Sequence, residues 1–242
     1  FCMGYPNSSS QSAALYKRAK QVLPDGNSRT TIALKPYPIY IAEAAGAEVI
    51  DVDGNRYIDF NNNYTSLLHG HSFEPVRNAV SAQLAKATAC SFTTETEIEL
   101  AELLCNRVDS FQRIRFCNSG SEAVMNMLKA ARAFTGRPKV AKIEGLYHGS
   151  YDFAEVSLKN RPEDREGLVP RSTAYSFGTP NSVLNEVIPL PFNESKATEE
   201  IILHHADSLA CIMIDLMPQT LSMSSPSAGY LSTLVRLSEQ HN

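Results

Sequence analysis

The sequence predicts an α/β protein: a three-layer α/β/α domain with a mostly parallel sheet, preceded by an N-terminal helix and a small antiparallel meander. Three observations favour this class. Strand patterns alternate with helical patterns from about residue 114 onward. Turn residues separate the apolar runs between residues 40 and 60. The 242 residues are 43% hydrophobic and 20% charged, which provides for a sizeable core.

Residues 1–61 are expected to form an N-terminal segment that belongs to a smaller domain. Residues 12–23 carry apolar side chains at helical spacing, and Pro24-Asp25-Gly26 breaks that pattern. Strand patterns and the turn between them follow at 40–41, 47–52, 53–55 and 56–60. These runs predict the meander.

Residues 62–242 are expected to form the large domain, incomplete at its C-terminal end. Pro75 is typical of the first turn of a helix, and an apolar face follows it to residue 87. The run Thr-Glu-Thr-Glu at 94–97 has the form of a capping box and precedes a second apolar stripe, to Val108. Two amphipathic helices are therefore expected before the alternating region.

A strand, helix and strand are predicted at 114–116, 121–135 and 139–143, and they imply a right-handed parallel crossover. Gly136 and Pro138 signal the end of the helix. Its expected buried side carries Val124, Met127, Leu128, Ala131 and Phe134. Lys139 and Lys142 are expected to flank or solvate the second strand.

The last third of the chain begins with a polar surface excursion at 150–185, where Pro, Gly and Ser are scattered. A helix is predicted at 199–204 and a buried strand at 210–214. The face formed by Leu231, Leu234, Val235 and Ser238 indicates a final helix.

Composition excludes several classes of protein. The net charge of −4 removes the electrostatic footprint of a general nucleic-acid binder. No apolar run approaches the length needed to cross a bilayer, so no membrane role is expected. The five cysteines are odd in number and form no CxxC pair, so neither a disulfide framework nor a zinc ribbon is indicated and a cytoplasmic location is expected. His69 and His71 lack a third ligand nearby, so no metal site is predicted.

The run Asn-Ser-Gly-Ser-Glu-Ala at 118–123 lies between a predicted strand and the first turn of a helix. The unpaired amides of Gly120 and Ser121 would point at one spot under the positive end of the helix dipole, which suits a phosphate. The hydroxyls of Ser119 and Ser121 add donors. The alternative is an ordinary serine-capped helix N-terminus.

A second polar stretch, residues 144–150, follows the next predicted strand. Ligands of open α/β sheets collect outside the carboxyl ends of strands, so both stretches are expected to open onto one crevice. Tyr147, flanked by glycines, could lie against a flat ligand. The alternative is a loop tyrosine that packs on its own chain.

Together these motifs resemble the class III aminotransferases, which are fold-type I enzymes that use pyridoxal 5'-phosphate (PLP). The Asn-Ser-Gly-Ser-Glu-Ala and Tyr-His-Gly runs are joined by Asp-Gly-Asn-Arg-Tyr-Ile-Asp-Phe at 53–60 and by His-Gly-His at 69–71. The run Pro-Asp-Gly-Asn-Ser-Arg at 24–29 is most similar to the branch with glutamate-1-semialdehyde aminomutase and β-amino acid aminotransferases. The resemblance covers nearly all of the chain, with its motifs in order.

The resemblance implies a PLP-transferase large domain and a set of site residues. Cofactor contacts would come from Ser119, Gly120, Ser121, Tyr147 and His148, with Tyr147 stacked on the pyridine ring and His148 as a hydrogen-bonding scaffold. Arg29, helped by Ser28, would bind the substrate carboxylate. Family members commonly have Glu-Pro at the end of the 210–214 strand, where this chain has Asp215-Leu216.

The resemblance further implies an aminotransferase with a small-molecule amino donor and a keto or aldehyde acceptor, acting as a homodimer. No catalytic residue is assigned within this chain, because the family's Schiff-base lysine is expected beyond Asn242. An aminomutase of the glutamate-1-semialdehyde type and a truncated, non-catalytic protein of the same fold are the alternatives. On this interpretation, activity of the 242-residue piece alone is doubtful.

Overall fold

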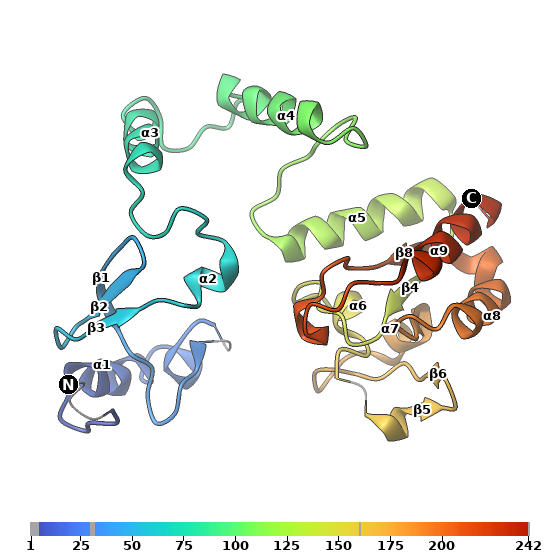
Figure 1. Ribbon diagram of the computed structural model, residues 1–242, viewed down its shortest axis with the longest axis horizontal. Helices are drawn as coiled ribbons and strands as arrows, with labels where there is room; N and C mark the ends of the chain where they lie inside the picture. The colour runs from blue at the N-terminus through green and yellow to red at the C-terminus, as the bar shows by residue number, and fades with distance from the viewer. Residues whose placement is uncertain (1–4, 30–31, 160, 242) are drawn as a thin grey trace. The chain divides into compact units, whose positions relative to one another are not determined.

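The computed structural model describes residues 5–29, 32–159 and 161–241, and it divides the chain into two compact units. The N-terminal unit is Phe1–Glu99 and the C-terminal unit is Leu100–Asn242, and Figure 1 labels their elements. The boundary expected after residue 61 stays a prediction. In the described ranges no helix is both long and apolar enough to cross a membrane.

The N-terminal unit contains the predicted helix and meander. Its elements are α1 (Gln11–Ala19), η1 (Pro24–Gly26), β1 (Ile41–Ala45), β2 (Glu48–Asp51), β3 (Arg56–Ile58), α2 (Asn62–Thr65) and α3 (Glu74–Leu84). The three strands form one antiparallel sheet in the order β1-β2-β3. Ser10 caps the N-terminus of α1, since its side chain accepts a hydrogen bond from the amide of Ala13, and the helix ends before the break predicted at Pro24.

The hairpin between β2 and β3 is organised by the buried carboxylate of Asp51. This carboxylate accepts hydrogen bonds from the amides of Asp53 and Asn55, the side-chain amide of Asn55 and the hydroxyl of Tyr57, at 2.8–2.9 Å. Burial acts to raise the pKa of Asp51, but the hydrogen bonds from Asn55 and Tyr57 outweigh it and hold the pKa below its usual value. The predicted turn at 53–55 is confirmed.

Element α2 is a left-handed turn. Asn62, Asn63, Tyr64 and Thr65 have φ of 50°, 49°, 56° and 66°. Left-handed backbone costs roughly 1–2 kcal/mol for each L-residue, and asparagine tolerates it better than tyrosine or threonine. Four such residues in a row persist only where surrounding contacts hold them.

Helix α4 (Glu95–Arg107) spans the division between the units. The helical and strand elements of the C-terminal unit are α5 (Gly120–Thr135), β4 (Lys139–Ile143), α6 (Asp152–Glu155), η3 (Pro162–Asp164), β5 (Arg165–Glu166), β6 (Val169–Pro170), α7 (Asn181–Glu186), β7 (Val187–Leu190), α8 (Ser195–His205), η4 (Ala206–Ser208), β8 (Leu209–Met213), η5 (Gln219–Leu221) and α9 (Ala228–His241).

A parallel sheet in the order β7-β4-β8 forms the centre of the C-terminal unit. Helix α5 packs against β8, while α8 and α9 pack against β7, β8 and each other (Figure 1). Ala141 and Ile143 of β4 share a buried cluster with Ile202 of α8 and with Leu234 and Leu237 of α9. The α/β class with a mostly parallel sheet is confirmed.

Three local expectations differ from the structure. Residues 114–116 form no strand, because this segment has no ladder partner in the part of the chain that the structure describes. On α5, Leu128 is fully buried, but Met127 and Phe134 are 45% and 90% exposed. Val235 of α9 is exposed too, since the buried face of that helix carries Tyr230, Leu234 and Leu237.

Helix α5 is joined tightly to β4. Ser119 caps its N-terminus and Gly136 caps its C-terminus. Gly136 has φ of 69°, and its amide donates a hydrogen bond to the carbonyl of Arg132 that closes the last turn, as the sequence predicts. The guanidinium of Arg132 donates to the carbonyl of Pro138 (2.7 Å) just before β4 begins. These caps fix where the helix begins and ends relative to the strand.

Replacing Leu128 with alanine should lower the free energy of unfolding by about 2–4 kcal/mol, because it leaves a cavity under α5. Urea unfolding followed by circular dichroism would measure this. Lys129→Ala, on the exposed side of the same turn, is the matched control and should change the free energy by less than about 0.5 kcal/mol. Equal effects of the two substitutions would contradict the packing described for Leu128.

Candidate functional site

The N-terminus of α5 presents unpaired backbone donors. Ser119 is the N-cap residue, and its hydroxyl oxygen accepts the amide of Glu122 at 3.2 Å. The Glu122 carboxylate in turn accepts the amide of Asn118 at 2.9 Å. Among the described residues, the amides of Gly120 and Ser121 have no hydrogen-bond partner. We call Ser119, Gly120 and Ser121 the amide cup.

The amide cup is open rather than plugged. Ser119 and Gly120 are exposed, and a methyl group built on Gly120 would meet no atom within 4 Å. Two free N–H groups at the positive end of a 16-residue helix attract an anion. Ser119 caps this helix in the ordinary way, and the amides of Gly120 and Ser121 stay available to a ligand after capping.

The loop after β4, residues 144–150, lies directly against the amide cup. The hydroxyl oxygen of Ser121 accepts the amide of Ser150 at 2.8 Å. Gly149 has φ of 95°, and a Cβ atom there would lie 2.5 Å from the Ser121 Oγ and 2.7 Å from its Cα. Only glycine allows this approach. The two polar stretches therefore meet beside the carboxyl end of β4, and the crevice expected between them stays a prediction.

Tyr147 stands at the exposed edge of this loop. Its side chain is 52% exposed, and its hydroxyl lies 3.5 Å from the Ser150 hydroxyl. Because Ser150 also donates its amide to Ser121, Tyr147 is linked to the amide cup through one residue. An exposed aromatic ring beside an anion site suits a ligand with both a phosphate and a flat ring.

Charged residues are buried beneath the loop. Lys142 has no exposed surface, and its ammonium group donates to the carbonyl of Ile143 at 3.3 Å. Burial, partly offset by the Glu144 carboxylate, lowers the pKa of Lys142 to about 8. The expectation that Lys142 would be solvated is wrong, because β4 is the central strand of the sheet. Lys139, at its start, is half-buried.

Glu144 is the acidic partner in this interior. It is 4% exposed and receives two contacts from Arg165, Nη2 to Oε1 and Nε to Oε2, the second at 3.3 Å. A forked pair of this kind compensates much of the desolvation cost of a buried carboxylate. Sequence reasoning missed the pair, because Arg165 lies 21 residues downstream in a polar excursion.

His148 is neutral at physiological pH. Burial, together with the nearby positive charge of Lys142, lowers the pKa of His148 to about 4, although Asp215 acts in the opposite direction. Its Nε2 atom is buried and has no hydrogen-bond partner among the described residues. A buried ring nitrogen without a partner is costly, which marks it as a group available to a ligand or another segment.

The two residues expected to bind the substrate carboxylate, Ser28 and Arg29, lie in the N-terminal unit. Both are exposed. The Arg29 guanidinium donates to the Oδ1 atom of Asn63 at 3.2 Å and lies over the Tyr64 ring, 5.4 Å from its centroid. Neither contact was anticipated from the sequence, since the polar run at 61–64 carries no motif of its own.

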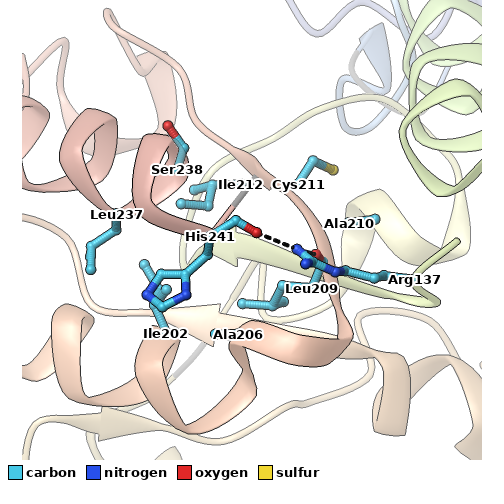
Figure 2. A pocket seen from close by; sticks show the side chains of 10 residues that line it. All are labelled: Arg137, Ile202, Ala206, Leu209, Ala210, Cys211, Ile212, Leu237, Ser238 and His241. Carbon is cyan, nitrogen blue, oxygen red and sulfur yellow. Dashed lines mark hydrogen bonds between the residues drawn. The ribbon is translucent and has the colours of Figure 1, made fainter. Parts of the chain in front are cut away.

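Figure 2 shows a different cavity, of about 70 Å³, at the amino-terminal end of β8. It is lined by Arg137, Ile202, Ala206, Leu209, Ala210, Cys211, Ile212, Leu237, Ser238 and His241. Arg137 crosses it to donate to the carbonyl of His241 at 2.8 Å. Because β4 and β8 are parallel, this cavity lies at the opposite end of the sheet from the amide cup. Its size and apolar lining indicate a packing void.

Comparison with solved structures gives the same architecture. An omega-transaminase from Sphaerobacter thermophilus is 47% identical, with a TM-score of 0.95 over 98% of this chain and 54% of that chain. A transaminase with PLP bound is 40% identical, with a TM-score of 0.87 over 95% of this chain and 53% of that chain. Among curated proteins, glutamate-1-semialdehyde 2,1-aminomutase of Haloarcula marismortui is 36% identical over 232 residues, 96% of this chain and 50% of its own length.

A parallel sheet with an open cup of amides beside the carboxyl end of its central strand, together with these structural relatives, defines the fold of the PLP-dependent transferases. Within that class, the chain belongs to the class-III aminotransferase family, whose model matches residues 32–242. The chain spans about half the length of the curated relatives it matches.

The lowered pKa of His148 predicts a pH dependence of stability. The unfolded chain binds a proton on this side chain below about pH 6.5, whereas the folded chain does so only near pH 4. Stability should therefore fall as the pH drops through this window, by on the order of 2 kcal/mol. Urea unfolding at several pH values, compared with His148→Gln, isolates the effect. Parallel profiles for the two proteins would contradict it.

Proposed function

We propose that this chain forms the cofactor-binding portion of a PLP-dependent aminotransferase, which moves an amino group from a carboxylate-bearing donor to a keto or aldehyde acceptor. Membership of the class-III aminotransferase family supports the proposal, as do the named activities of the two transaminases above. The observation that carries it is the approach of Gly149 to Ser121, which joins an anion site and an exposed aromatic ring.

The residues of the amide cup fit the phosphate of PLP. The amides of Gly120 and Ser121 would donate to phosphate oxygens, and the hydroxyl of Ser119 can donate because its oxygen serves as the cap acceptor. Ser121 accepts from Ser150 and likewise keeps its proton for the ligand. PLP supplies the electron sink for the chemistry; the chain's residues bind and orient it.

Tyr147 would lie against the cofactor ring, and His148 would offer the cofactor a hydrogen bond. A neutral His148 has one ring nitrogen that donates and one that accepts. The positive charge of Lys142 and the burial around it keep the ring in that neutral form. The role proposed for His148 is a fixed hydrogen-bonding scaffold rather than a proton shuttle.

Arg29, with Ser28, would bind the carboxylate of the amino donor. A planar guanidinium offers two parallel N–H groups that match the two carboxylate oxygens. This contact would orient the donor and discriminate against amines without an acidic group. The family's Schiff-base lysine stays a prediction for sequence outside these 242 residues.

An aminomutase is the second candidate. Curated relatives that match 94–96% of this chain at 33–36% identity are glutamate-1-semialdehyde 2,1-aminomutases. Such an enzyme would use the same cofactor residues but move the amino group within one molecule. We further propose that the complete protein works as a homodimer in the cytoplasm, where the free thiols of the four described cysteines would persist.

Gly149→Ala should weaken PLP binding by the complete protein by about tenfold or more, because the new methyl group drives the 144–150 loop away from Ser121. Gly178→Ala is the matched control. Gly178 has φ of 91°, but its added Cβ meets nothing within 4 Å, so the same backbone strain arises without the clash. Equilibrium dialysis measures both affinities, and equal losses would contradict the role given to the close approach.

Nitrogen-15 tracing distinguishes the two candidate activities. An aminotransferase transfers labelled nitrogen from an amino acid donor to added pyruvate or 2-oxoglutarate. An aminomutase converts glutamate-1-semialdehyde without labelling an added keto acid. We expect label in the added acid, detected by mass spectrometry of the complete protein's products. Label confined to rearranged glutamate-1-semialdehyde would replace the first candidate with the second, and no turnover of either kind would contradict both.

A further inference from the structure

We propose that Asn63 is a positioning residue that presents the Arg29 guanidinium to the donor carboxylate, and that the left-handed turn α2 exists to hold it there. This inference rests on the proposed function, in which Arg29 binds that carboxylate. It assigns a role to a segment that no motif marks, residues 61–67, and to the Asp59 and His71 side chains that anchor it.

The guanidinium of Arg29 contacts two neighbouring residues of the turn, Asn63 and Tyr64. Arg29 Nη1 donates to Asn63 Oδ1 at 3.2 Å, and the Tyr64 ring covers one face of the guanidinium. Among the described residues, the remaining N–H groups of this guanidinium have no hydrogen-bond partner. One donor is thus used to fix the plane, and the other donors stay available for a bidentate acid.

The orientation of the Asn63 amide is determined by its neighbours. Its Nδ2 atom donates to the Ser66 hydroxyl oxygen at 2.9 Å. That hydroxyl donates its own proton to the main-chain carbonyl of Asn63 at 2.9 Å. Since Ser66 can only accept from Nδ2, the Oδ1 atom is the one that faces Arg29. The acceptor offered to Arg29 is therefore fixed.

The turn is held at both ends by side chains. Asp59 Oδ1 accepts the amides of Asn61 and Asn62 at 2.9 and 3.0 Å, and the Asn61 side chain accepts the amide of Tyr64 at 2.9 Å. The Asn62 side chain donates to the carbonyl of Leu67 at 2.7 Å. These bonds account for the persistence of the positive φ values from Asn62 to Thr65.

Asp59 is itself fixed to the meander. Its Oδ2 atom lies 2.7 Å from His71 Nε2, and His71 exchanges two backbone hydrogen bonds with Gly46, at 2.8 and 2.9 Å. Gly70 is required for this bridge, since a Cβ atom there would lie 2.6 Å from the Gly46 carbonyl oxygen. A continuous set of contacts thus runs from the meander through His71, Asp59 and the turn to Arg29.

The Arg29 guanidinium donates to the side-chain amide oxygen of Asn63 rather than to a carboxylate, and this difference affects how Arg29 would bind a substrate. A neutral oxygen orients the guanidinium without cancelling its positive charge, which stays available for the substrate. An aspartate at position 63 would satisfy Arg29 on its own and compete with the incoming acid. Asn63→Asp should therefore be more harmful than removal of the side chain, although it is the smaller change in shape.

The test uses the complete protein with PLP bound and 3-phenylpropanoate, a carboxylate without an amino group, as the probe in calorimetric titration. Asn63→Gly suits the positive φ and removes the acceptor for Arg29 together with the Nδ2 donor to Ser66. The dissociation constant should rise about threefold to tenfold, the effect of freeing one long side chain. Asn63→Asp should raise it more. Asn193→Gly makes the same chemical change at another position of positive φ (62°) and should leave the constant unchanged.

A kinetic comparison separates positioning from general damage. The amines 3-amino-3-phenylpropanoate and 1-phenylethylamine differ only by the carboxylate. In Asn63→Gly the KM should rise for the first amine alone, with kcat little changed for both. An equal rise for 1-phenylethylamine would overturn the inference, because that donor has no acid for Arg29 to bind.

Arg29→Gln makes failure of the inference distinguishable from failure of the proposed function. If this variant loses 3-phenylpropanoate binding while both Asn63 variants bind normally, the positioning role is overturned and the role of Arg29 stands. If Arg29→Gln binds the probe as tightly as the unchanged protein, the carboxylate site proposed at Arg29 is overturned, and the role of Asn63 with it.

Discussion

The candidate site depends on one close approach, that of the Gly149 backbone to Ser121. It requires a residue without a Cβ atom, a positive φ at that residue and a serine whose oxygen can accept the amide of Ser150. The caps at Ser119 and Gly136 fix the ends of α5, and the short turn that follows leads into β4. With both segments so constrained, the free amides and the backbone that carries Tyr147 have a defined relation.

Beneath this backbone framework lies a charged interior that the chain holds at some cost. Lys142 lies in β4 and Glu144 directly follows that strand, and Arg165 at the start of β5 compensates the acid. The low dielectric of this region couples Lys142 to His148. The neutral state of His148 thereby depends on its burial and on Lys142, a residue without exposed surface.

The sequence was informative where structure is local. The small residues at the start of α5, the glycines around Tyr147 and the turn at 53–55 are chemical requirements of a few neighbouring residues, and the structure has them where the sequence indicates. Burial of Lys142 was not predictable, because it follows from β4 lying between β7 and β8, two strands far away in sequence. The partners of Arg29 were missed for a related reason: a left-handed turn of non-glycine residues has no propensity signal and arises only from the contacts around it.

Hydrogen exchange in helices α3 and α4 would show whether their apolar faces are covered. They have 11 and 13 residues, and none of these residues is buried, although apolar side chains such as Val76, Val80, Ile98 and Leu103 follow one another along them. Isolated helices of this length are marginal in water. Backbone amides of helices without a buried face exchange hydrogen with heavy water readily, so slow exchange in α3 and α4 would report that their apolar faces are covered.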